Sequence, residues 1–179
     1  FFGGGIGIPQ IEYAKITSNE QIFGIPLALV GVVLGICYLV FDRFTKAFFM
    51  KLQGKIGIVI STMLGGLVLG VMGTYFPLTM FSGEESMGEI ITTYKEYAPW
   101  LLILTGLLKL LLTNVCIKSG WRGGHFFPVI FSGVSVGCGV AILTGLNSAF
   151  CMGVITAGLL GVIMKKPFAV SLLLMLCFP

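Results

Sequence analysis

Ser119-Gly120-Trp121-Arg122-Gly123-Gly124-His125-Phe126-Phe127-Pro128 is a glycine-rich break between two apolar runs. The proline that ends it is tolerated in the first turn of a helix, because its missing N–H would have no intrahelical acceptor there. We therefore predict that a helix begins near His125. The N–H groups of such a first turn are unpaired and carry the positive end of the helix dipole. A helix start buried at membrane depth can therefore bind a small anion.

Two glycines precede the predicted helix start. Gly123 and Gly124 place no side chain beside it, so an anion could reach the backbone amides. Irregular backbone is tolerated at membrane depth only where it is buried in protein or lines a watery cavity. The residues alone leave two interpretations open: an anion site, and an ordinary cytoplasmic turn with a helix cap.

The composition defines the class of protein. Of 179 residues, 56% are hydrophobic and 10% are charged, whereas soluble domains carry about 25% charged residues. Mean hydropathy is +1.04, and most charges fall between apolar runs, as a bilayer-spanning chain requires. The 26 glycines are typical of closely packed or broken membrane helices. We predict an all-α, polytopic transmembrane helical bundle with broken or re-entrant helices.

Apolar stretches and polar connections divide the chain. The expected apolar stretches are residues 27–41, 56–76, 100–117, 126–143, 148–164 and 168–178. Segment 84–97 is too short and too polar to span, and we expect a short interfacial or re-entrant helix there. Residues 1–25 form a polar, glycine-rich connector and 26–179 the transmembrane domain. Because the sequence begins without Met and stops directly after an apolar run, we expect it to be a fragment.

Loop charge predicts an orientation. Segment 42–55, expected to be a loop, carries four basic residues and one acidic residue, and the positive-inside rule places it in the cytoplasm. The acidic segment 77–99 is then outside, and the loop with Lys118 and Arg122 is inside. The turn at Lys165-Lys166 is inside as well if stretches 126–143 and 148–164 together make a round trip, and every connection then agrees with one orientation.

Several classes of function are disfavoured. The eleven Lys and Arg residues form no basic stripe with interleaved aromatics, which argues against nucleic acid as a partner. The five cysteines have no zinc-type spacing, and His125 has no second ligand nearby, so we expect no metal or other cofactor. Without a Ser/His/Asp or Cys/His constellation, an enzyme is not expected. Lys109 lies mid-span and is a functional candidate, with snorkelling or burial against a polar partner as the alternative interpretation.

A family resemblance favours the anion site. Gly124-His125-Phe126-Phe127-Pro128 matches the G-x-F-x-P motif of the CLC family of chloride channels and chloride/proton antiporters, and a Ser-Gly-x-x-Gly lead-in precedes it, as in that family. Segment 153–167, which ends in Lys165-Lys166-Pro167, resembles the family's helix, basic turn and proline-started next helix. The order of elements from Pro26 to Pro179 resembles the family's helices J to P.

The resemblance implies the second of two inverted repeats in a homodimer of the cell membrane, with chloride as substrate and protons as a second substrate in antiporters. It assigns the anion to the backbone amides of Gly124, His125 and Phe126, with Gly123, Phe127 and Pro128 shaping the site. The family's first-repeat serine loop, gating glutamate and anion-contacting tyrosine lie outside this sequence. Leu176 stands where many relatives have glutamate, which suggests a divergent bacterial branch.

Three questions stay open from the sequence. It does not distinguish a channel from an antiporter, because the residues that would do so are not part of it. A secondary transporter could use the same broken-helix device for another anion, such as fluoride or an organic carboxylate. A membrane scaffold in which the break is only a turn is the remaining alternative.

Overall fold

The computed structural model describes residues 21–80 and 84–177, and within these ranges its regular structure is helical. The α-helices are α2 (Gly24–Tyr75), α3 (Glu84–Thr93), α4 (Pro99–Ser119), α5 (Phe126–Thr144), α6 (Ser148–Met164) and α7 (Pro167–Cys177). Two short 3-10 helices, η1 (Pro77–Thr79) and η2 (Tyr94–Glu96), flank α3. The prediction of an all-α bundle is confirmed. Most of the expected connector at 1–25 lies outside the described residues.

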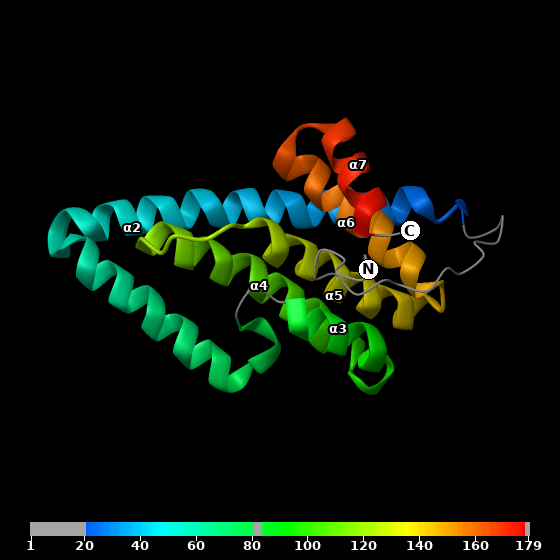
Figure 1. Cartoon of the computed structure of the whole chain (residues 1–179), viewed down its shortest axis with the longest axis horizontal. Helices are drawn as coiled ribbons and strands as arrows, with labels where there is room; N and C mark the ends of the chain where they lie inside the picture. Colours follow the sequence, from blue (N-terminus) through cyan, green and yellow to red (C-terminus); the bar gives the residue numbers. More distant parts are fainter. Residues whose placement is uncertain (1–20, 81–83, 178–179) are drawn as a thin grey trace, which may run out of the picture.

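Helix α2 folds back on itself as a helical hairpin (Figure 1). Gly57, with φ 80° and ψ 166°, separates a first arm (24–56) from a second arm (58–75). Glycine enters this left-handed region without the steric cost that a side chain would bring. Our prediction of a loop at 42–55 is wrong, because this segment continues the first arm as helix. Its Lys, Arg, Leu, Met and Gln residues favour helix, and charge alone does not end one.

Helix α5 forms the centre of the core. Every residue from 128 to 139 is buried, as expected of a helix that is apolar on all sides. Helices α4 and α6 both pack against it. Ser135 Oγ of α5 donates to the Leu102 carbonyl of α4 at 2.7 Å, which links the two helices through a buried hydrogen bond.

The first arm of α2 packs against α6 through glycine. A Cβ atom placed on Gly31 would lie 3.0 Å from the Cα atom of Gly158, so the two backbones are in direct contact. One helical turn further on, Gly35 packs against the side chain of Val162. Small residues allow this close approach between membrane helices. Because residue numbers rise together along the two helices, the first arm and α6 run in the same direction.

The basic segments 42–55 and 118–122 lie at one end of the bundle. Lys118 Nζ forms a salt bridge with Asp42 Oδ1 at 2.7 Å. In Figure 1 the turn of α2 and the end of α4 lie at this end, while α3 and the α5–α6 connection lie towards the opposite end. The expected basic and acidic connections are therefore separated in space. Which end faces the cytoplasm stays a prediction.

Three of the described helices, α2, α4 and α5, are long and apolar enough to cross a membrane. Helix α6 is apolar but shorter, with 17 residues. Large apolar side chains are exposed along both arms of α2; they include Val33, Val40, Ile58, Met63 and Leu67. Apolar faces of this extent suit contact with lipid or with other membrane helices rather than with water. The chain is part of an integral membrane protein.

Candidate anion site

Helix α4 ends in a left-handed turn at Gly120, whose φ is 118°. The N–H of Trp121 donates to the Cys116 carbonyl at 3.1 Å, and that of Gly120 to the Ile117 carbonyl at 3.4 Å. These bonds close the helix in the manner of a Schellman motif. A Cβ on Gly120 would be strained by this φ and would lie 2.7 Å from Thr62 Oγ1. Glycine at this position therefore fixes where α4 stops and the break begins.

Side chains of α2 hold the last two carbonyls of α4. Gln53 Nε2, from the first arm, donates to the Lys118 carbonyl at 3.0 Å. From the second arm, Ser61 Oγ and Thr62 Oγ1 donate to the Ser119 carbonyl at 3.2 and 3.0 Å. The final four carbonyls of a helix lack intrahelical donors, and all four have donors here. We call Gln53, Ser61 and Thr62 the α2 clamp.

Trp121 forms a further contact between the break and α2. Its Nε1 donates to the Thr62 carbonyl at 3.1 Å, and its ring lies beside Gly66, where a Cβ would approach to 3.2 Å. The clamp and Trp121 together join both arms of α2 to the backbone directly before the predicted site. The break is therefore held by tertiary contacts rather than by its own sequence alone.

Helix α5 begins at Phe126, with His125 as its N-cap. The N–H of Val129 donates to the His125 carbonyl at 3.2 Å. The amides of Phe126 and Phe127 precede this first intrahelical donor, Pro128 has no N–H, and the His125 side chain makes no capping bond. These amides are therefore directed to a ligand or solvent at the positive end of the helix dipole. The predicted helix start at His125 is confirmed.

Gly123 and Gly124 leave room beside this helix start. Both are exposed, and a Cβ on either would meet no atom of the described residues within 4 Å. Neither has a positive φ. These two glycines are therefore not needed for packing or for an unusual backbone in this part of the chain. What they provide is space next to the amides.

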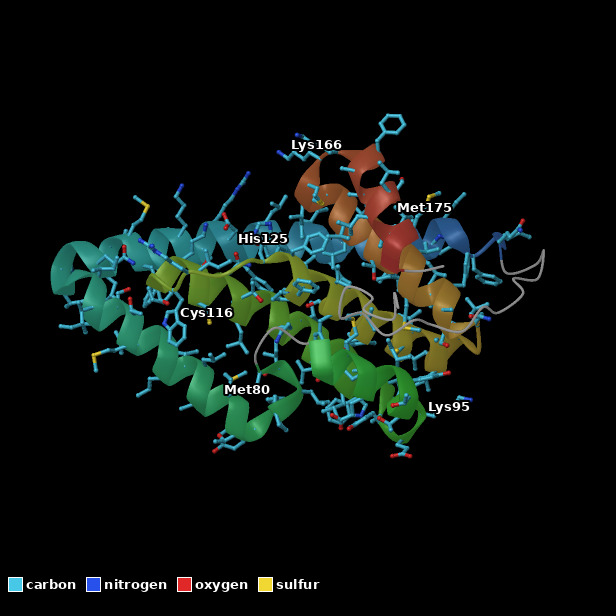
Figure 2. All side chains as sticks on the ribbon, viewed as in Figure 1. Met80, Lys95, Cys116, His125, Lys166 and Met175 are labelled. Atoms are coloured by element: carbon cyan, nitrogen blue, oxygen red, sulfur yellow. The ribbon has the colours of Figure 1, made fainter. Side chains whose placement is uncertain are left out.

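A cavity of about 500 Å³ opens beside the break. Its wall comes from the second arm of α2, from η1 and the residue after it, from α4, from the break and from the first turn of α5. The lining residues are Leu69, Thr79, Met80, Lys109, Leu112, Thr113, Cys116, Ile117, Trp121, Arg122, Gly123, Gly124, Phe127 and Pro128. Figure 2 shows Met80 and Cys116 on the side of α4 that faces the second arm of α2.

The predicted site residues divide between two sides of the helix start. Those that line the cavity are Gly123, Gly124, Phe127 and Pro128. The side chain of His125 lies instead next to the first arm of α2 (Figure 2). Its ring is beside that of Tyr38, with centroids 6.4 Å apart. Phe126 is half-buried against the hydrophobic core. Gly123 and Gly124 thus border the cavity, whereas the side chains of His125 and Phe126 lie away from it.

Lys109 is the buried charged residue of the cavity wall, with 2% of its side chain exposed. Its Nζ donates to the carbonyls of Thr79 at 2.7 Å and Met80 at 3.0 Å. It also lies 5.2 Å from the centroid of the Phe131 ring, within cation–π range. The structure therefore shows burial against polar partners rather than snorkelling.

The sequence interpretation missed the α2 clamp and the place of Lys109 on the cavity wall. One local signal was available: Ser61-Thr62 is a polar pair inside an otherwise apolar, glycine-rich run, and polar residues in membrane helices commonly bond across helices. For metals, the described part of the chain contains no group of three His, Cys, Asp or Glu side chains suited to an ion.

An apolar helical bundle with a broken helix, whose unpaired start lies next to a cavity, is a device of membrane transport proteins. The sequence matches the family described as "Voltage gated chloride channel" over residues 2–179. The chain therefore belongs to the voltage-gated chloride channel family, and the resemblance to CLC proteins is confirmed.

Curated relatives carry the name "Putative ion-transport protein YfeO". The protein of this name from Escherichia coli O1:K1 / APEC is 24% identical over 138 residues. That of E. coli O17:K52:H18 is 25% identical, and that of Escherichia fergusonii 24%, over the same length. Each match covers 76% of this chain and 32% of the relative. The chain thus spans about a third of the length of the curated relatives it matches.

Proposed function

We propose that this chain is the second repeat of a protein that moves chloride or a similar halide across the cell membrane. The observation that carries the proposal is the unpaired start of α5, reached past Gly123 and Gly124 from a cavity. Amide dipoles offer an anion a partial positive charge rather than a full one. Such a site binds an ion firmly enough to select it and weakly enough to release it, as conduction requires.

The comparisons support this proposal at the level of the family. The family's description concerns chloride channels, and the relatives' name concerns ion transport. The family resemblance extends the proposal to a homodimer and to further pore elements outside this chain. For an antiporter it also implies coupling to protons. Passive conduction and proton exchange are both compatible with the part of the protein that this chain represents.

Anion flux measured with the full-length protein tests the proposal. Liposomes loaded with chloride and containing the purified protein should release chloride when valinomycin balances the charge, and protein-free liposomes should not. Simultaneous recording of external pH separates the two mechanisms, since an antiporter moves protons against chloride and a channel does not. A protein that releases acetate or fluoride but no chloride would contradict the assignment of chloride.

Anion-dependent stability in detergent separates the remaining alternatives. A ligand that binds only the folded state raises the melting temperature, and the stabilisation grows with the logarithm of its concentration above Kd. Chloride or bromide should therefore protect the protein, with gluconate at equal ionic strength as the control. Protection by organic carboxylates alone would indicate the other class of transporter. The absence of protection by any anion would favour a scaffold.

A further inference from the structure

The cavity beside the break is electropositive among its described residues. Its lining includes two cationic side chains, Lys109 and Arg122, and no Asp or Glu. The remaining side chains are mostly apolar, and low-polarity walls focus the field of the charges that they carry. An anion entering this space therefore approaches the start of α5 along a wall that carries two positive charges.

The two cations differ in depth. Arg122 belongs to the break and is exposed, whereas Lys109 lies in the middle of α4 and is buried. The backbone carbonyls of Thr79 and Met80 hold the Lys109 ammonium in place. These two carbonyls orient the ammonium group and do not themselves cancel its net charge. The buried cation is therefore a fixed element of the wall, while the exposed one lies where solvent and salt reach it.

We propose that the anion reaches the start of α5 through this cavity, and that Lys109 and Arg122 serve it in two different ways. The fixed charge of Lys109 sets the affinity for the bound anion without contacting it, so Lys109 is a positioning and affinity residue rather than a ligand. Arg122 increases the rate at which anions enter. This inference rests on the proposed function and extends it to two side chains and a route of access.

The expected size of the effect follows from distance. A sphere of 500 Å³ is about 10 Å across, and unit charges that far apart in a partly buried setting change a binding constant roughly tenfold. Salt dependence distinguishes the roles of the two cations. The Debye length falls from about 10 Å at 0.1 M to about 3 Å at 1 M, and salt screens exposed charges far more than buried ones. The effect of Lys109 should persist in high salt, and that of Arg122 should vanish.

Three substitutions at Lys109 in the full-length protein separate charge from anchoring. Lys109→Gln keeps a hydrogen-bond donor for the Thr79 and Met80 carbonyls and removes the charge, Lys109→Met removes both, and Lys109→Arg keeps both. Bromide affinity is measured by calorimetry at constant ionic strength, after gel filtration confirms folding. We expect Gln and Met to weaken bromide binding about tenfold, and Arg to recover most of that loss. Lys46→Gln, which removes an exposed cation from the basic segment 42–55, is the control for net charge.

Arg122→Gln supplies an independent test at an exposed position. Anion flux into liposomes should fall about threefold at low ionic strength, and the difference should disappear in 1 M of an impermeant salt. An unchanged flux at low ionic strength would overturn the proposed route, whatever the folding of the Lys109 variants.

Two further outcomes would overturn the role of Lys109. If Lys109→Gln binds bromide as the wild type does, the residue only anchors Thr79 and Met80. If Lys109→Arg is as weak as Lys109→Gln, charge does not set the affinity. In both cases the wild type still binds bromide, so the proposed function stands. A wild type that binds no halide would instead overturn the proposed function itself.

Discussion

The hydroxyl of Thr62 donates to the carbonyl of Ser119 at 3.0 Å, across 57 residues of sequence. This bond joins the second arm of α2 to the last residue of α4, directly before the break that leads to the start of α5. The Trp121 indole returns a hydrogen bond to the Thr62 carbonyl at 3.1 Å. The position of the helix start is therefore tied to the α2 hairpin, and loosening this attachment should affect both stability and anion binding.

Removing the hydroxyls of the α2 clamp tests this dependence. Hydrogen bonds between membrane helices contribute about 1 kcal/mol each, so the double variant Ser61→Ala/Thr62→Val should lower the free energy of unfolding by about 2 kcal/mol. Thermal unfolding of the full-length protein in detergent measures the change. Thr74→Val is the matched control, because the exposed Thr74 hydroxyl bonds only within its own helix, to the Val71 carbonyl. Equal melting of the double variant and the control would show that the clamp is not needed.

Most helix boundaries were predictable because local residues set them. The stretch predicted at 148–164 matches α6, and the stretch predicted from 126 matches the start of α5. Apolar runs between Pro, Gly and Asn caps decide such ends. The error at 42–55 arose because a run of charge was taken for a loop. The helix continues there until Gly57, whose conformation ends it.

The candidate site was predictable in part for the same reason. Pro128 marks a helix start through its own backbone, and Gly123 and Gly124 leave space beside that start because they have no side chains; the sequence displays both properties directly. The α2 clamp depends on which faces of α2 and α4 meet, and its bonds join residues 57 to 65 positions apart. Whether Lys109 points into a cavity or at lipid depends on tertiary packing in the same way. Hydropathy patterns carry little information on such contacts.

Membrane orientation can be tested with single cysteines in a background that lacks the native ones. Lys51→Cys lies on the exposed basic end of the first arm of α2, and the positive-inside rule predicts that an impermeant maleimide labels it only from the cytoplasmic side. Lys95→Cys, exposed beside the acidic helix α3, should be labelled only from outside. Labelling of the two positions from the same side would refute the separation of the basic and acidic ends, and a reversed pattern would invert the orientation.

Close contact between α2 and α6 makes Gly31 sensitive to any larger residue. Gly31→Val would force a branched side chain against the backbone of Gly158, and overpacking of this kind costs about 1 to 3 kcal/mol. We expect a lower melting temperature for the purified full-length variant. Gly161→Ala, on α6 with nothing within 4 Å of its Cβ, should be neutral or add up to about 1 kcal/mol, because alanine favours helix. Equal melting of both variants would argue against the contact.

The order of halide preference should not depend on Lys109. A charge that acts over a distance attracts chloride, bromide and iodide alike, whereas contact with amides discriminates between ions of different size. Lys109→Met should therefore lower the affinity for each halide by a similar factor and keep their order. Competition between halides in a flux assay measures this. A reversed order would place the ammonium in contact with the ion.

The central claim is that backbone amides at the start of α5 bind the anion. Substitutions at His125 and Gly124 distinguish this from binding by a side chain. His125→Leu leaves the amides in place and should retain halide affinity within about tenfold, or ~1.4 kcal/mol. Gly124→Val introduces a branched side chain where the space is open and φ is not positive. That variant should fold and lose halide binding because the approach to the amides is blocked.

Halide calorimetry on these two variants of the full-length protein, with folding checked by gel filtration, is the most direct test. The account predicts that His125→Leu binds chloride or bromide nearly as the wild type does, and that binding by Gly124→Val is too weak to detect. A folded His125→Leu protein without detectable halide binding, beside a Gly124→Val protein that binds normally, would contradict the account and make the imidazole the ligand.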